Sequence, residues 1–279
     1  MKYTKVSIII ENATPPFFLG SQLRGAFGNA LKRVVCINPS FKCDECFAKD
    51  NCLYYQFYEK KNVYHKFRFD YELGKSYYDF SLYLFDDTVS KLPYVVSSLY
   101  QMIVKIGFGK DRKTYTKFDM FVNDSSIFKD GEIILPKNYE KKFKIDTFSP
   151  NISVRFVTPL RLKKNNHFIK PEELELKDLI NSIYKRELRL QNIELKKLDF
   201  ELKGDMAKKE LKFVDISRYS NRQKTKLKIG GLVGEMQIKD IDEKSYKLLK
   251  LGEIIGVGKQ TVFGLGKMRV EDRQRKDIV

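Results

Sequence analysis

The chain has 279 residues, 42% of them hydrophobic and 32% charged, which is typical of a folded protein of one or two domains. Its formal net charge of +17 favours a polyanionic partner, either nucleic acid or an acidic membrane surface. No apolar run approaches the ~20 residues of a membrane span. The first ten residues also lack a secretory signal, so we expect a cytoplasmic protein with no membrane partner.

Hydrophobic periodicity predicts the elements of the first half in a clear order. We expect a strand over residues 2–10, a helix over 21–35, strands over 63–71 and 77–85, a helix over 92–106, and strands around 115–122 and 132–135. Gly25 and Gly28 weaken the first helix, and we expect them to admit a neighbouring segment. The order β-α-β-β-α-β is that of a ferredoxin-like unit.

The second half repeats this order after a polar, basic linker at residues 137–144. Expected elements are a strand over 152–157, a helix over 171–190, strands over 211–217 and 225–238, a helix over 242–251 and a strand over 266–270; residues 191–209 stay unassigned. Asp242 is the expected N-cap of the last helix and Gly252 its expected stop. The sequence thus predicts an α+β fold of two tandem ferredoxin-like domains, residues 1–140 and 141–279, with a Cys-rich insertion at 36–52 in the first.

A short internal repeat supports this duplication. The sequence Ile-Gly-Val-Gly-Lys at residues 255–259 repeats Ile-Gly-Phe-Gly-Lys at 106–110, an offset of 149 residues. Each copy closes a predicted helix and opens a predicted strand. An offset near half the chain indicates two copies of one domain and not a solenoid, whose repeats are about 20–50 residues long.

The four cysteines all lie within the insertion, at Cys36, Cys43, Cys46 and Cys52. Their spacing, C-x6-C-x2-C-x5-C, allows four thiolates to surround one metal ion. Disulfides are disfavoured in a reducing cytoplasm. We expect a structural zinc ion, with an iron–sulfur cluster as the less favoured alternative.

A glycine-rich loop near the end of the chain can approach an anion closely because glycine accepts positive φ. It departs from both the P-loop and the dinucleotide-binding patterns. A plain helix–strand connection is the alternative. The residues expected to contact an anionic ligand are Gly256, Gly258, Lys259, Gln260, Gly264, Gly266 and Lys267.

Residues 218–228 carry five cations and no acidic residue. Read as one strand, they place Arg222, Lys224, Lys226 and Lys228 on one face. Like charges stacked in this way favour a polyanion beside them, although a solvated basic edge that deters aggregation is the alternative. Tyr219 and Asn221 are suited to base stacking and base-edge contacts, so we favour nucleic acid.

His65 and His167 are the only histidines. An unperturbed histidine suits proton transfer near neutral pH, although a single histidine is more often a surface or packed residue. Neither has the neighbours of a catalytic triad or a metal site.

Three stretches together resemble the CRISPR precursor-RNA processing endoribonucleases of the RAMP superfamily. They are residues 19–28 leading into the cysteines, residues 158–162, and residues 218–223 leading through 230–234 to the glycine loop. The resemblance implies a metal-independent cleavage in which a ribose 2′-OH attacks the adjacent phosphate and leaves 2′,3′-cyclic phosphate and 5′-OH ends, with no catalytic cofactor. It places Arg24, Arg218 and Gln223 among the RNA-binding residues.

Many members of this family carry an acid–base histidine on or just after the first helix, but residues 21–35 contain none. The resemblance therefore favours His65, then His167, then a lysine of the basic segment; Tyr219 is a further candidate. The expected partner is CRISPR repeat RNA, with other CRISPR effector subunits as additional partners. The alternative functions are a non-catalytic RAMP subunit that binds RNA and a general RNA-binding module.

Overall fold

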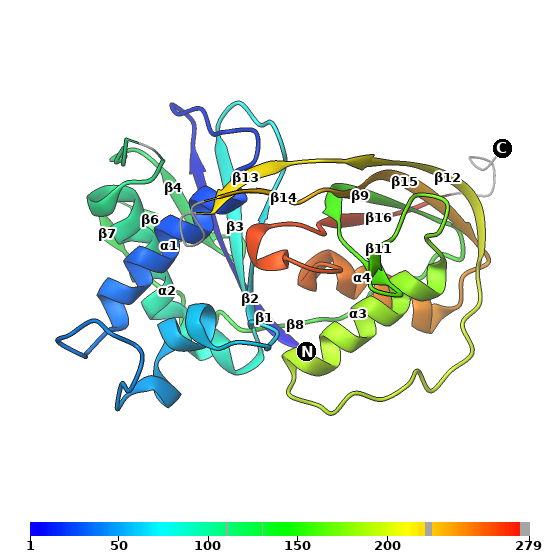
Figure 1. Cartoon of the computed structure of the whole chain (residues 1–279), viewed down its shortest axis with the longest axis horizontal. Coiled ribbons are helices and arrows are strands. Elements are labelled where there is room, and N and C mark those ends of the chain that lie inside the picture. The colour runs from blue at the N-terminus through cyan, green and yellow to red at the C-terminus, as the bar shows by residue number, and fades with distance from the viewer. Residues whose placement is uncertain (110, 130, 221–224, 274–279) are drawn as a thin grey trace. The chain divides into compact units, whose positions relative to one another are not determined.

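The computed structural model describes residues 1–109, 111–129, 131–220 and 225–273. The chain divides into two compact units, Met1–Lys142 and Phe143–Val279, at a point within the expected linker. Each is a mixed α/β unit whose helices pack beside an antiparallel sheet (Figure 1). Within the described residues, no helix is long and apolar enough to cross a membrane.

The first unit has the expected β-α-β-β-α-β order. Its main elements are β1 Lys2–Ile10, α1 Gly20–Val35, β2 Phe67–Tyr71, β3 Tyr78–Phe85, α2 Leu92–Gln101 and β4 Asp119–Val122. The sheet order is β2-β3-β1-β4, and all of these pairs are antiparallel. On β1, Thr4, Val6, Ile8 and Ile10 are buried, because alternate residues of a strand face the same side.

Smaller elements complete this unit. Short strands are β5 Ser125–Ser126, β6 Phe128–Lys129, β7 Glu132–Ile133 and β8 Lys141–Lys142. Short helical turns cover Lys49–Asn51, Tyr55–Glu59, Asp86–Lys91 and Met102–Ile106. The expected strand at 132–135 is reduced to β7, which pairs only with β6 and not with the main sheet.

The second unit repeats the order of the first. Its main elements are β9 Ile152–Leu160, α3 Leu176–Leu190, β12 Asp205–Val214, β15 Gly231–Lys239, α4 Glu243–Ile255 and β16 Met268–Asp272. The antiparallel sheet has the order β12-β15-β9-β16. Two small hairpins, β10 Lys163–Lys164 with β11 His167–Phe168 and β13 Ser217–Ser220 with β14 Thr225–Lys228, stand apart from it, and a short helical turn covers Thr261–Phe263.

The start of α4 is confirmed and its end is corrected. Asp242 caps the helix by accepting a hydrogen bond from the Ser245 amide at 2.9 Å. Burial opposes ionisation of Asp242, but the hydrogen bonds that it accepts from Ser245 and from the Lys203 amide outweigh this and lower its pKa. Gly252 does not stop the helix; the helix continues to Ile255, and Gly256 ends it with φ 73°.

The two glycines of α1 differ in their surroundings. A Cβ atom on Gly28 would lie 2.5 Å from the ring of Tyr58, so this glycine admits a neighbouring segment as expected. A Cβ atom on Gly25 would meet nothing within 4 Å, so the same expectation is wrong there.

Candidate functional site

The glycine-rich loop joins α4 to β16 and is held by its own hydrogen bonds. Its amides donate to residues of the same unit: Gly258 to Ser182 Oγ at 3.2 Å, Lys259 to the Arg161 carbonyl at 2.8 Å, and Gly266 to the Pro159 carbonyl at 3.1 Å. The Gly264 amide donates to the Thr261 carbonyl at 2.9 Å. These amides are therefore used within the unit, and backbone contacts from Gly258 and Gly264 to an anion stay a prediction.

At two of these positions a backbone carbonyl lies so close that only glycine fits. A Cβ atom on Gly266 would lie 1.8 Å from the Val257 carbonyl oxygen, and one on Gly258 would lie 2.4 Å from the Arg161 carbonyl oxygen. Both residues also have positive φ, 70° and 76° respectively, which disfavours any side chain. The loop is thus a rigid support for the side chains that it carries, among them exposed Lys259.

Two arginines stack on aromatic rings beside this loop. Arg161, which directly follows β9, places its guanidinium 4.1 Å from the centroid of the Phe168 ring, and its Nη1 donates to the Gly230 carbonyl. Arg218 on β13 lies 4.6 Å from the centroid of Phe263, a loop residue. Burial lowers the pKa of both arginines, which nevertheless stay charged at neutral pH.

Several buried polar atoms around the loop have no hydrogen-bond partner within the described parts of the chain. They are Arg161 Nε, Arg218 Nε and Gln260 Oε1. Gln260 also adopts a left-handed backbone with φ 64°. Because buried polar groups are nearly always hydrogen-bonded, these two donors and one acceptor mark a place where water or a polar ligand can make the missing contacts.

The basic segment is a hairpin and not the single strand expected from its alternating pattern. β13 pairs with β14 in the register Ser217↔Lys228 to Ser220↔Thr225, so the segment reverses direction. Asn221, Arg222, Gln223 and Lys224 lie outside the described residues. Tyr219 and Lys226 are opposite each other in the register. Exposed Lys228 forms an ion pair with Asp215 at 3.4 Å.

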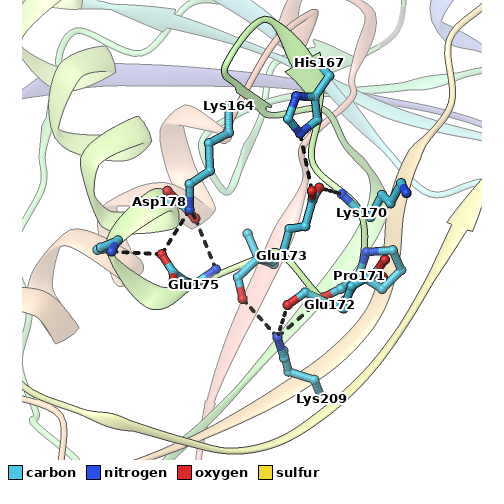
Figure 2. A network of polar contacts seen from close by, with 11 residues as sticks. Lys164, His167, Lys170, Pro171, Glu172, Glu173, Glu175, Asp178 and Lys209 are labelled. Carbon is cyan, nitrogen blue, oxygen red and sulfur yellow. Dashed lines mark hydrogen bonds and ion pairs between the residues drawn. The ribbon is translucent and has the colours of Figure 1, made fainter.

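His167 lies in a surface network of charged residues (Figure 2). It is on β11, and its Nε2 is 3.4 Å from Glu173 Oε1. The Lys170 amide donates to the same carboxylate and is the main cause of its lowered pKa. Lys164 contacts both Glu175 and Asp178 nearby. Because these carboxylates repel an anion, the surface around His167 is less suited to binding a phosphate than the glycine loop is.

His65 is half-buried in an aromatic cluster of the first unit, between the Tyr55–Glu59 turn and β2. Its Nδ1 lies 3.0 Å from the Gln56 carbonyl oxygen, and its ring centroid is 6.2 Å from that of Phe67. A carbonyl oxygen only accepts, so Nδ1 carries the proton and Nε2 of the neutral ring is the basic nitrogen. The role of His65 as a base stays a prediction.

Arg24 approaches the same aromatic cluster from α1. Its guanidinium lies 4.5 Å from the Tyr58 ring centroid and 5.6 Å from that of Phe67. His65 and Arg24, which are 41 positions apart in the sequence, thus each lie beside the ring of Phe67. Sequence reasoning missed Tyr58 and Phe67 as the partners of these residues, because an aromatic residue in a hydrophobic pattern looks like an ordinary core residue.

The four cysteines are free thiols, each half-buried. Within the described residues, no group of three or more His, Cys, Asp and Glu side chains is arranged to hold a metal ion. Burial raises the pKa of Cys43, although nearby Lys32 lowers it in part. The structural zinc ion on the four cysteines stays a prediction from their spacing.

Comparisons with known proteins agree with this architecture. Residues 154–268 match the family model of the CRISPR-associated endoribonuclease Cas6, and residues 2–139 match a family described as an N-terminal domain. An uncharacterized protein of Archaeoglobus fulgidus is 24% identical over 91% of this chain and 92% of its own length.

Solved structures with a similar fold cover nearly the whole chain. A Cas6 product complex is 15% identical over 97% of this chain and 100% of its own, with a TM-score of 0.55. An RAMP protein described as binding different RNA substrates is 12% identical over 98% and 100%, with a TM-score of 0.53. A Cas6 from Thermus thermophilus is 16% identical over 97% and 98%, with a TM-score of 0.50.

The chain therefore has the fold of the RAMP proteins. This likeness in fold extends over nearly the whole chain, and the match to the Cas6 endoribonuclease family model covers residues 154–268 of the second unit.

Proposed function

We propose that this protein is an endoribonuclease that binds CRISPR repeat RNA and cleaves it without a metal ion. The match of residues 154–268 to the Cas6 endoribonuclease family carries this proposal. The net charge of +17 and the two arginine–aromatic stacks beside the glycine loop support it, because RNA needs both cations and stacking surfaces. In this interpretation, each unit is a ferredoxin-like domain.

The reaction that we propose is an attack by the ribose 2′-oxygen on the adjacent phosphorus. A base removes the 2′-OH proton as the new P–O bond forms, and an acid protonates the 5′-oxygen as the P–O5′ bond breaks. The products are a 2′,3′-cyclic phosphate and a 5′-OH. Cations near the phosphorane stabilise its developing negative charge.

His65 is the base that we favour. Its Nδ1 is fixed by the Gln56 carbonyl at 3.0 Å, which leaves Nε2 as the basic nitrogen of the neutral ring. The guanidinium of Arg24 lies 5.6 Å from the centroid of the same Phe67 ring. His167 is the second choice, since its Nε2 already faces Glu173.

The test is incubation of the protein with the repeat RNA of its host in the presence of EDTA. We expect cleavage, and we expect no cleavage of an RNA with a single 2′-deoxy nucleotide immediately before the scissile phosphate. Loss of cleavage with EDTA while the protein stays folded would contradict the metal-independent mechanism. Tight binding without any cleavage would instead identify a non-catalytic RAMP subunit.

A further inference from the structure

The first unit contains its own copy of the glycine turn, between α2 and β4 (Figure 1). Gly107 ends the helical segment with φ 72° and ψ 165°, and Gly256 ends α4 with φ 73° and ψ 163°. In both copies a buried hydrophobic residue and a second glycine with positive φ follow, Gly109 at 89° and Gly258 at 76°. The five-residue repeat is therefore also a repeat of backbone conformation.

This first turn is anchored in the core of its unit. The Phe108 and Lys113 backbones exchange hydrogen bonds of 3.2 and 3.1 Å, and the Tyr115 amide donates to the Ile103 carbonyl at 2.9 Å. The rings of Phe108 and Tyr115 both pack on Tyr78, with centroids 5.0 and 5.9 Å away. Burial, followed by the interaction with Tyr78, raises the pKa of Tyr115 to about 12, so this phenol stays neutral.

The anchored turn presents cations that have no acidic partner. Lys105, Arg112, Lys113 and Lys117 are exposed, and no ion pair joins them to any acid in the described part of the chain. Among the described residues, the lysines of this unit that do form ion pairs include Lys66, with Asp86, and Lys141, with Asp124. Residues 105–109 and 111–117, which we name the basic turn, contain a single acid, Asp111. Lys110 lies outside the described residues.

We propose that the basic turn is a second anion-binding site, which holds the phosphate backbone of a single-stranded segment of RNA. The inference rests on the proposed function, namely that the protein binds RNA. A fixed turn with several uncompensated cations suits a polyphosphate chain, because each neutralised phosphate releases counterions.

The test is the salt dependence of RNA binding, measured with the whole protein and with two RNAs of equal length, the host repeat and an unrelated single strand. In the variant Arg112→Gln/Lys113→Gln/Lys117→Gln, the slope of log K against log salt should fall by about 2, since each phosphate contact on a single strand contributes about 0.7. If the variant and the wild-type protein bind equally at 1 M salt, a slope difference of about 2 makes the variant bind RNA up to about 100-fold more weakly at 0.1 M salt.

The matched control removes three other exposed cations of the first unit, as Lys42→Gln/Lys91→Gln/Lys137→Gln. It should leave the slope almost unchanged. A second variant, Gly109→Ala, keeps every charge but places a Cβ atom 2.8 Å from Gln22 Nε2 at φ 89°, and it should also weaken binding.

An unchanged slope in the triple variant, or an equal loss in the control, would overturn the inference. Equal binding of both RNAs, with no cleavage of either, would contradict the proposed function alone. The slope would still decide the role of the basic turn.

Discussion

Replacement of Gly266 by alanine tests whether the glycine loop is a packed element of the second unit. The new Cβ atom would lie 1.8 Å from the Val257 carbonyl oxygen, so the loop must move. That movement breaks two hydrogen bonds of Gly266, the one that its carbonyl accepts from Val257 at 3.0 Å and the one that its amide donates to Pro159 at 3.1 Å.

The expected cost follows from these two effects. A left-handed backbone costs a residue with a Cβ atom about 1–2 kcal/mol, and Gly266 has φ 70°. Each lost hydrogen bond adds about 1 kcal/mol. The free energy of unfolding should therefore fall by about 3–4 kcal/mol, which lowers the Tm of a domain of this size by about 10–15 °C.

The control is the same substitution at Gly25, in the interior of α1, where a Cβ atom meets nothing within 4 Å. Gly25→Ala should raise stability by up to about 1 kcal/mol, because alanine favours a helix. Scanning calorimetry, with urea unfolding as a second measurement, gives both values. If the two variants unfold within about 2 °C of each other, the packed-loop argument is wrong.

Three further predictions concern catalysis, the metal site and helix capping. Single-turnover cleavage should fall about 100-fold or more in His65→Ala and by less in His167→Ala, with RNA affinity nearly constant; wild-type rates in both variants would exclude a histidine base. Elemental analysis of protein purified without chelators should find one zinc or iron per chain, and Cys43→Ser should lower Tm more than the cleavage rate; absence of both metals would reject the site. Asp242→Ala should cost about 1 kcal/mol at neutral pH. This loss should shrink as the pH is lowered. The pKa of Asp242 is lowered in the folded protein, so its charged form stabilises the fold above the unfolded pKa of about 3.9, and this stabilisation disappears as the pH falls through the folded pKa. An equal loss at pH 7 and pH 2 would contradict this prediction.

The long periodic elements could be predicted from the sequence alone. β1, α1 and the start of α4 have the expected positions, because the spacing of apolar residues and a capping aspartate act through near neighbours. The sequence alone could not show which of two glycines, Gly252 or Gly256, ends α4. Gly252 remains helical with Ile183 and Met268 packed against it, contacts that are remote in sequence, while Gly256 takes positive φ.

The candidate site also has some features that the sequence shows and others that only the tertiary structure decides. Its residue types, namely arginines, lysines and glycines with a high net charge, are properties of the sequence, and they indicated a polyanionic ligand. The two-residue alternation of the basic segment predicts one strand, but a hairpin has the same alternation, and only the pairing of β13 with β14 distinguishes the two. Which cations form stacks was also decided by tertiary structure. Arg218 meets Phe263, and Arg24 meets Phe67, across more than forty residues of chain, and such contacts exist only once the sheet and helices have packed.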